Sequence, residues 1–285
     1  MEKKLILRGA LAGGLGGLLA FVFARIFAEP LIQQAIDYEE GRGEAQEKLD
    51  RAAGLAVGGH EHEIFSRTIQ ADVGIGVGLI VFGVALGALF AVAYVICIGR
   101  TGNIRPRALA LLVAAAGFVG FYLVPFMKYP ANPPAVGNDD TIVQRTQLYL
   151  IMVAASLILM FVAVVLGQRL AKRIGTWPAS MWAGLGFLVA VGVVMLVLPP
   201  LGHLDANVAE AGKRATETPL PLRDPEGNIV FPGFPADVLA KFRVYSVTAQ
   251  LILWATIGLV FAPLADRLLT GKRSGSARVE ETSAA

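Results

Sequence analysis

The chain has 285 residues, of which 55% are hydrophobic and only 16% are charged. Ordinary soluble domains carry about 25% charged residues, so this composition excludes a single water-facing globule. The formal net charge is +3, but the basic residues stand at the ends of apolar segments, which excludes the basic patch typical of nucleic-acid-binding proteins. We therefore predict an all-α integral membrane protein.

Six apolar segments are long enough to cross a bilayer, since a helix needs about 20 apolar residues to span a hydrocarbon core of about 30 Å. These segments are Gly9–Ala28, Val73–Ile98, Ala108–Met127, Leu148–Leu166, Met181–Leu201 and Val244–Leu264. They predict a bundle of about six transmembrane helices that forms a single domain over residues 1–270, with a disordered cytoplasmic tail over residues 271–285. A signal peptide is the alternative interpretation of the first segment, but no Ala-x-Ala cleavage site is evident.

Glycines and hydroxyl residues give finer predictions about the helices. Glycines repeat every four residues in three sets, a spacing that favours close helix packing in lipid; the sets are Gly9/Gly13/Gly17, Gly74/Gly78 and Gly83/Gly87. Thr141 followed by Gln144 resembles a capping box at the start of the fourth helix. Thr176, followed by Pro178, is typical of the start of the fifth helix.

The distribution of charge predicts the orientation of the bundle. With both termini inside, the inner segments hold 13 Lys and Arg residues against four acids, and the outer segments hold 11 against 18. Basic residues favour the cytoplasmic side, so we expect an N-in, C-in topology. The two long connections, about Glu29–Asp72 and Gly202–Arg243, then lie outside. The first is expected to contain a surface helix, and the proline-rich second connection is expected to be mostly extended or looped.

The strongest local pattern is His60-Glu61-His62-Glu63 in the first outer connection. Imidazole and carboxylate groups together bind divalent ions such as cobalt, nickel and zinc. Two interpretations remain open. The segment is either a solvated loop or a site at which His60, His62 and Glu63 capture a metal ion. Further candidate metal ligands stand at the outer ends of other helices, and these are Glu29, Asp72 and His203.

A polar stripe continues from this segment into the second helix. Steps of three and four residues place His60, Glu63, Arg67 and Gln70 on one helical face, and such a face is costly when it points to lipid. We expect it to face the bundle or an outer vestibule. Further candidate vestibule residues at the same depth are Lys128, Arg145, Arg243 and Gln250. Interfacial anchoring with interhelical hydrogen bonds is the alternative interpretation.

Several patterns that carry chemistry are missing from the sequence. No carboxylate or histidine occupies the middle of a predicted span, and there is no phosphate-binding Gly-x-x-x-x-Gly-Lys-Ser/Thr loop, HExxH, CxxC or Gly-x-Ser-x-Gly. The only cysteine, Cys97, cannot form an internal disulfide, and we expect it to be packed in an apolar environment. We therefore predict a protein that is not an enzyme, has no catalytic residues and requires no cofactor.

Three stretches carry a family resemblance. They are Glu29-Pro30-Leu31-Ile32 after the first helix, the sequence KYPANPPAVG at Lys128–Gly137 followed by Arg145-Thr146-Gln147-Leu148-Tyr149-Leu150, and Gly233–Asp237 with Phe242-Arg243 and Ser246. Together they resemble the CbtA-type cobalt transporter subunits of bacteria over nearly the whole chain. The polar residues of these stretches, including Asn132, map to the predicted outer side. Pro133 and Pro134 fix φ and remove backbone donors, which predicts a rigid lid or, alternatively, a plain connector.

The resemblance implies a multi-pass subunit of a cobalt uptake system in the bacterial inner membrane, in the context of cobalamin biosynthesis. It also implies a small single-span CbtB-type partner with a histidine-rich end. We therefore expect the chain to capture Co²⁺, or a similar divalent cation, at the outer polar vestibule. The alternative hypothesis is a non-transporting membrane scaffold or assembly protein, because the predicted spans lack ionisable groups at their centres.

Overall fold

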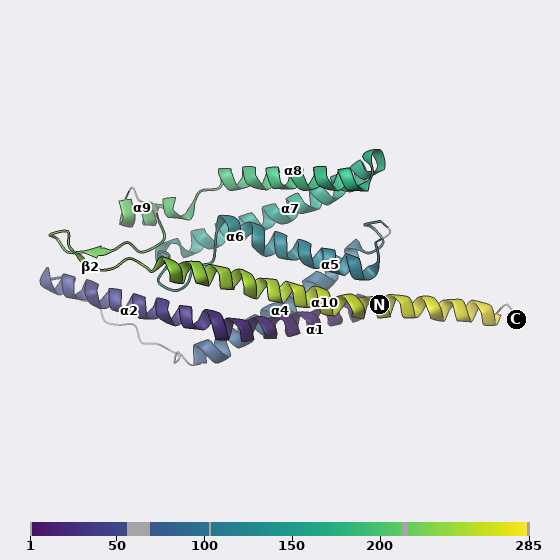
Figure 1. The fold of residues 1–285 in the computed structure, drawn as a ribbon, viewed down its shortest axis with the longest axis horizontal. Helices are drawn as coiled ribbons and strands as arrows, with labels where there is room; N and C mark the ends of the chain where they lie inside the picture. Colours follow the sequence, from purple (N-terminus) through teal and green to yellow (C-terminus); the bar gives the residue numbers. More distant parts are fainter. Residues whose placement is uncertain (1, 56–68, 103, 213–215, 284–285) are drawn as a thin grey trace. The chain divides into compact units, whose positions relative to one another are not determined.

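The computed structural model describes residues 2–55, 69–102, 104–212 and 216–283, and of residues 70, 71, 211 and 270–283 only the backbone. Figure 1 shows an almost entirely helical chain with one short hairpin. The elements in chain order are α1 (Glu2–Phe23), η1 (Ala24–Ala28), α2 (Glu29–Ala52), η2 (Gln70–Gly74), α4 (Ile75–Cys97), α5 (Pro106–Gly117), η3 (Phe118–Leu123), α6 (Val124–Lys128), η4 (Asp139–Thr141), α7 (Ile142–Ile174), α8 (Thr176–Val197), η5 (Leu201–His203), α9 (Asp205–Ala211), β1 (Leu222–Arg223), β2 (Ile229–Phe231) and α10 (Ala236–Ser283).

The prediction of an all-α membrane protein with about six spans is confirmed. Within the described parts of the chain, six helical segments are long and apolar enough to cross a membrane. Each of them overlaps one predicted span, and the six are Glu2–Ala52, Asp72–Cys97, Pro106–Lys128, Asp139–Ile174, Thr176–His203 and Ala236–Leu269. The first is longer than predicted, because the π-helical turn η1 joins α1 directly to the polar helix α2.

Residue contacts divide the chain into two compact units, whereas the sequence predicts a single domain over residues 1–270. One unit comprises residues 1–23, 71–119 and 248–285, and the other comprises residues 24–70 and 120–247. Helix α10 extends to Ser283, through most of the segment for which the sequence predicts a disordered tail.

The first unit is built around a close contact between α1 and α4. A methyl group added at Gly9, Gly13 or Gly17 would collide with the α4 backbone, so the four-residue glycine repeat of α1 forms the contact surface. On the same unit's part of α10, Phe261 packs edge to face against Phe90 and Tyr94, with ring centroids 5.0 Å apart in each pair. The Gly74/Gly78 set is different, since nothing lies within 4 Å of a methyl group added at Gly78.

The second unit contains two substructures. Helices α7 and α8 pack as an antiparallel pair joined at Gly175, whose φ of 86° suits a residue without a side chain (Figure 1). The long connection after α8 contains α9 and the antiparallel β1–β2 hairpin, in which Leu222 is opposite Phe231. The hairpin turn is closed by Asp224, which accepts hydrogen bonds from the backbone and side-chain nitrogens of Asn228.

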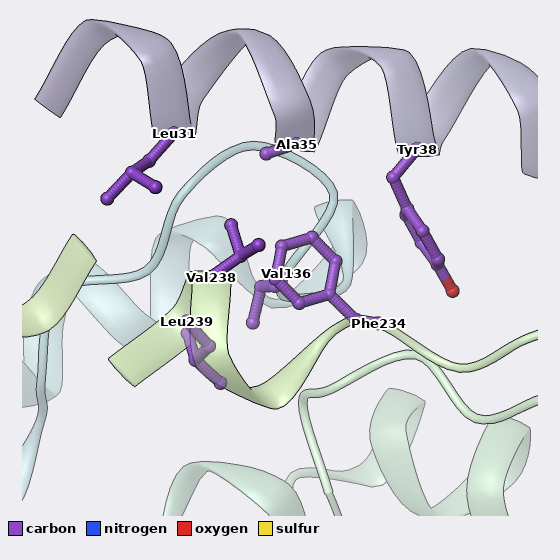
Figure 2. Packing of buried hydrophobic residues seen from close by; sticks show 7 residues of the cluster. All are labelled: Leu31, Ala35, Tyr38, Val136, Phe234, Val238 and Leu239. Carbon is purple, nitrogen blue, oxygen red and sulfur yellow. The ribbon is translucent and has the colours of Figure 1, made fainter. Parts of the chain in front are cut away.

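An apolar cluster in the second unit joins α2 to the start of α10 and to the loop after α6. Leu31, Ala35 and Tyr38 project from successive turns of α2 toward Val136 and Phe234 (Figure 2). These positions are three and four residues apart, so they share one helix face. The Tyr38 hydroxyl donates to the carbonyl oxygen of Pro232 at 3.0 Å. The cluster therefore fixes the loop of residues 129–138 against α2.

The predicted capping box at Thr141 is wrong. The Thr141 hydroxyl does not cap α7 but donates to the carbonyl oxygen of Asn138 at 2.6 Å. Asn138 caps the preceding 3-10 turn η4, because its side-chain oxygen accepts a hydrogen bond from the backbone nitrogen of Asp140 at 2.9 Å. Thr141 occupies the N-cap position of α7 as predicted, but without a side-chain hydrogen bond to the helix.

Candidate functional site

The loop of residues 129–138, between α6 and η4, shapes the candidate site. Pro133 opens a turn in which the backbone nitrogen of Val136 donates to its carbonyl oxygen at 3.3 Å. Ala135 has a φ of 65°, a left-handed conformation that non-glycine residues rarely adopt. At Gly137, where φ is 118°, an added side chain would collide with the guanidinium of Arg145. The loop therefore keeps its backbone close to Arg145.

Four polar side chains form what we call the outer network, consisting of Asn132, Arg145, Glu217 and Arg243. The Asn132 amide donates to Glu217 Oε2 at 3.3 Å, and the Arg145 guanidinium lies 3.8 Å from Glu217 Oε1. Arg243, on the first part of α10, donates to Asn132 Oδ1 at 2.8 Å and to the carbonyl oxygen of Ala131 at 3.4 Å. The network joins the loop of residues 129–138, α7, the connection after α9 and α10.

The charges of the outer network are unequal and partly buried. The side chains of Glu217 and Arg145 are only 12% and 24% exposed. Burial raises the pKa of the Glu217 carboxyl above its ordinary value of 4.5, and this effect exceeds the opposing effects of Arg145, the Asn132 hydrogen bond and Arg243. Arg145 Nε is buried and forms no hydrogen bond among the described residues. Two guanidiniums therefore face one carboxylate, which leaves a positive excess.

A cavity of about 990 Å³ adjoins the outer network, and we call it the vestibule. Its walls come from α2, the end of the third span, the loop of residues 129–138, α7 and α9. Aromatic and proline side chains supply much of the lining, together with the guanidiniums of Arg42 and Arg145. The aromatic and proline residues of the lining are Tyr122, Phe126, Tyr129, Pro130, Pro133, Pro134, Tyr149 and Pro219.

Three carboxylates of the vestibule, Glu39, Asp139 and Glu210, belong to solvent-exposed residues. The Asn138 amide donates to Glu210 Oε2 at 3.1 Å, which ties α9 to the loop. Arg42, on α2, is half-buried and donates to the carbonyl oxygen of Leu220 at 2.8 Å. The vestibule thus combines exposed negative groups with guanidiniums that are more buried.

The structure brings together three of the predicted vestibule residues, namely Asn132, Arg145 and Arg243. Lys128 stands shortly before Asn132 in the chain, with its Nζ 5.8 Å from the ring centroid of Tyr129. Asp72 and Gln250 belong to the other compact unit, and of Gln70 only the backbone is described. The predictions for His60, His62, Glu63 and Arg67 lie outside the described residues.

The two remaining candidate metal ligands, Glu29 and His203, differ in burial. Glu29 is buried at the start of α2, and His203 is exposed in η5. Within the described ranges, no group of three His, Cys, Asp or Glu side chains is placed to hold a metal ion. The part of the vestibule that is described thus offers exposed single carboxylates and not a closed coordination sphere.

Sequence reasoning missed Glu217, Glu39, Arg42, Asp139 and Glu210. Glu217 is 85 residues from Asn132 and lies in a proline-rich connection, so no local spacing indicates that the two meet. Glu39 and Arg42 are three residues apart on α2, which places them on one helix face. That spacing was a usable signal, since α2 was expected as a surface helix.

Comparison with known proteins gives one match. The family model described as probable cobalt transporter subunit (CbtA) matches residues 2–266. No curated protein and no solved structure matches the chain. The matched range includes every predicted span, the outer network and the vestibule.

Proposed function

The chain belongs to the CbtA family of probable cobalt transporter subunits, and we propose that it captures a divalent cation, cobalt, at the vestibule on the outer side of the membrane. The observation that carries this proposal is the family match over residues 2–266, because it spans all six membrane helices and every residue of the vestibule. Cobalt is here the cargo of the protein and not a resident cofactor.

The electrostatics of the vestibule support cation capture. Exposed carboxylates of Glu39, Asp139 and Glu210 create a negative potential that raises the local concentration of cations. The sequence His60-Glu61-His62-Glu63 follows α2 in the chain and supplies imidazole and carboxylate ligands suited to cobalt. Because the opposite connections are basic, the vestibule is expected on the outer side.

The family also suggests a partner and a cellular location for the protein. Membership in a family of transporter subunits favours transport over catalysis. The word subunit implies a partner, and we propose a small single-span CbtB-type protein. We further propose the bacterial inner membrane as the location, with the chain as its multi-pass component.

Cobalt uptake tests this function directly. In a bacterial strain without other cobalt importers, expression of the chain with its partner should increase the accumulation of radiolabelled Co²⁺ at limiting concentration. A strain that carries the partner alone is the control. Accumulation that is the same in both strains would contradict the proposal.

A double substitution tests the histidine pair. His60→Ala combined with His62→Ala should raise the cobalt concentration needed for half-maximal uptake, because two imidazole ligands are lost, and should leave folding intact. Gln46→Ala, at an exposed polar position of α2 that is not a candidate ligand, is the control. Uptake at limiting cobalt and thermal unfolding in detergent are the two measurements. Normal uptake in the double variant would remove the histidine pair from the mechanism.

A non-transporting scaffold is the second candidate, and α8 is the feature that favours it. Only 6% of its most apolar stretch is buried against the rest of the described chain. A methyl group added at Gly184, Gly186 or Gly192 meets nothing within 4 Å. Such a surface suits contact with lipid or with another membrane protein. Purified protein in liposomes, with and without the partner, separates the candidates, since a scaffold would not increase cobalt entry in either preparation.

A further inference from the structure

We infer that the vestibule binds the divalent cation as its chelate with a small organic carboxylate, and that Arg145 contacts the carboxylate part. This inference rests on the proposed function for the identity of the cation. It goes beyond that function by naming the chemical form of the cargo.

The vestibule is too large for a hydrated ion alone. Liquid water occupies about 30 Å³ per molecule, so an ion with six waters fills roughly 200 Å³. The cavity has about 990 Å³, which is in the range of sites that enclose small organic molecules. The excess volume is available for an organic ligand that arrives with the metal.

The lining has the chemistry of an organic-anion site. Tyr122, Phe126 and Tyr149 present apolar ring surface, and Pro133 and Pro134 add rigid apolar surface from the loop. Guanidiniums are planar donors that match carboxylates in a two-point contact. The Arg145 side chain lines the cavity and is 24% exposed. An incoming carboxylate would add a partner to its guanidinium.

The charge distribution disfavours a bare cation at the end of the vestibule that adjoins the outer network. The partly buried carboxylate, Glu217, is already engaged by Asn132 and Arg145. A second guanidinium, that of Arg243, donates a hydrogen bond to Asn132. A bare divalent cation beside Arg145 would therefore meet a local positive excess.

A metal chelate fits both parts of the vestibule. Its carboxylate can meet Arg145, whereas its metal, which still carries exchangeable water, can face the exposed carboxylates Glu39, Asp139 and Glu210. One ligand with a negative and a positive region thus matches a cavity with partly buried guanidiniums and exposed acids.

Equilibrium dialysis of the full chain in detergent tests this inference, with ⁵⁷Co²⁺ and ¹⁴C-citrate as probes. The equimolar mixture should be retained with both labels at a ratio of one to one. Each probe alone should bind at least about tenfold more weakly, because either the metal contact or the guanidinium contact is missing. Cobalt that binds equally well without citrate, or citrate that binds equally well without cobalt, would overturn the inference. Inorganic phosphate that displaces the labelled complex as effectively as unlabelled cobalt–citrate does would also overturn it.

Two variants test the place of binding. Arg145→Gln should weaken retention of the cobalt–citrate complex at least about tenfold, whereas Arg51→Gln, at the exposed end of α2, should not change it. Thr146→Phe adds an aromatic ring to the cavity wall without touching the outer network, and it should exclude the complex while thermal unfolding stays unchanged. Unchanged retention in both Arg145→Gln and Thr146→Phe would place the complex elsewhere and overturn the inference.

Failure of this inference differs from failure of the proposed function. Gene-dependent uptake of cobalt from chelator-free medium, with no retention of the citrate complex, would reject the chelate and leave transport in place. If the gene increases uptake of neither free cobalt nor cobalt–citrate, but the purified chain retains the complex, transport would be rejected and the binding site supported.

Discussion

Arg243 joins α10 to the loop of residues 129–138 by hydrogen bonds. Its guanidinium donates to Asn132 Oδ1 and to the carbonyl oxygen of Ala131. Asn132 in turn donates to Glu217, so Arg243 supports the carboxylate indirectly. A chain of hydrogen bonds of this kind depends on each member, because the loss of one leaves a partly buried polar atom without its partner.

Arg243→Ala should therefore be more damaging than Arg223→Ala. We expect Arg243→Ala to lower the free energy of unfolding by about 2 kcal/mol, the size of a hydrogen bond to a charged group in a partly buried place. Arg223 is exposed and donates to Gly227 of its own hairpin, so its loss should have little effect. Thermal unfolding of both variants in the same detergent gives the comparison. Equal and mild effects would indicate that Arg243 only anchors the chain at the membrane surface.

Glu217 predicts a specific dependence of stability on pH. Burial raises its pKa in the folded protein above 4.5, so between 4.5 and the folded value the folded state binds more protons than the unfolded state. The contribution of Glu217 to stability is therefore fully present below pH 4.5 and decreases as the pH rises through the folded pKa.

Glu217→Gln should remove this part of the pH dependence, because the amide does not titrate and can still accept a hydrogen bond from Asn132. The measurement is the midpoint of thermal unfolding from pH 4 upward, in the parent and in the variant. Glu226→Gln, at an exposed position of the hairpin turn, is the control. A parent curve that rises over this range to the same extent as the variant curve would contradict the assignment.

At this scale the sequence predicts some of the site and not the rest. Asn132, Arg145 and Arg243 stand in stretches that carry the family resemblance, and the structure joins them in one network. Glu217 could not be predicted, because its partners come from other elements and the connection that holds it has no periodic pattern. Contacts between distant residues depend on the tertiary fold, which residue spacing alone does not encode.

The α1–α4 pair shows how an element depends on glycine. Added methyl groups at Gly13 and Gly83 would each collide with the opposite helix, so the two backbones approach through a mutual contact. In lipid, apolar side chains gain little by leaving the solvent, and close backbone packing supplies the attraction between helices. The sequence predicts this contact surface because its glycines recur on one face.

Gly13→Ala should destabilise the first unit by about 1–3 kcal/mol, since the extra methyl group forces the helices apart. The added group would lie 2.8 Å from the Cα atom of Gly87. Gly78→Ala lies on the partner helix α4, where an added methyl group has nothing within 4 Å; it is the control and should be neutral or slightly stabilising. Thermal unfolding in detergent measures both. Indistinguishable midpoints would mean that the α1–α4 contact does not limit stability.

Hydropathy predicts the six spans well, but it does not predict helix caps or π-helical turns. Apolar length is a property of each segment alone, which is why all six predicted spans overlap observed helices. The capping box at Thr141 was mispredicted because the Thr141 hydroxyl donates backward to the carbonyl oxygen of Asn138, in a 3-10 turn that the sequence does not predict. The π-helical turns η1 and η3 have no simple sequence signal.

On the scale of the whole molecule, lipid explains the many exposed apolar side chains. Leu188, Leu196 and Val197 of α8 are between 65% and 87% exposed within the chain. Such surfaces are unfavourable in water, and here they lie on a helix long enough to cross the bilayer. The protein should therefore require detergent or lipid to stay in solution, and the charged connections decide which side of the membrane each end of the bundle faces.

The orientation can be tested with single cysteines in a Cys97→Ala background. Thr176→Cys lies at the junction of α7 and α8, close in sequence to Arg169, Lys172 and Arg173, and Glu226→Cys lies in the exposed β1–β2 turn. Because basic connections remain in the cytoplasm, a membrane-impermeant maleimide should label Glu226→Cys in intact spheroplasts. It should label Thr176→Cys only after permeabilisation.

Cobalt uptake should be measured in both variants, so that labelling reports on a functional protein. The reverse labelling pattern would put the vestibule on the cytoplasmic side. Capture from outside would then be impossible at Glu39, Asp139 and Glu210, and the protein would have to work in export or in delivery inside the cell. The direction of transport thus depends on the charge asymmetry of the connections, which this experiment examines independently of any metal.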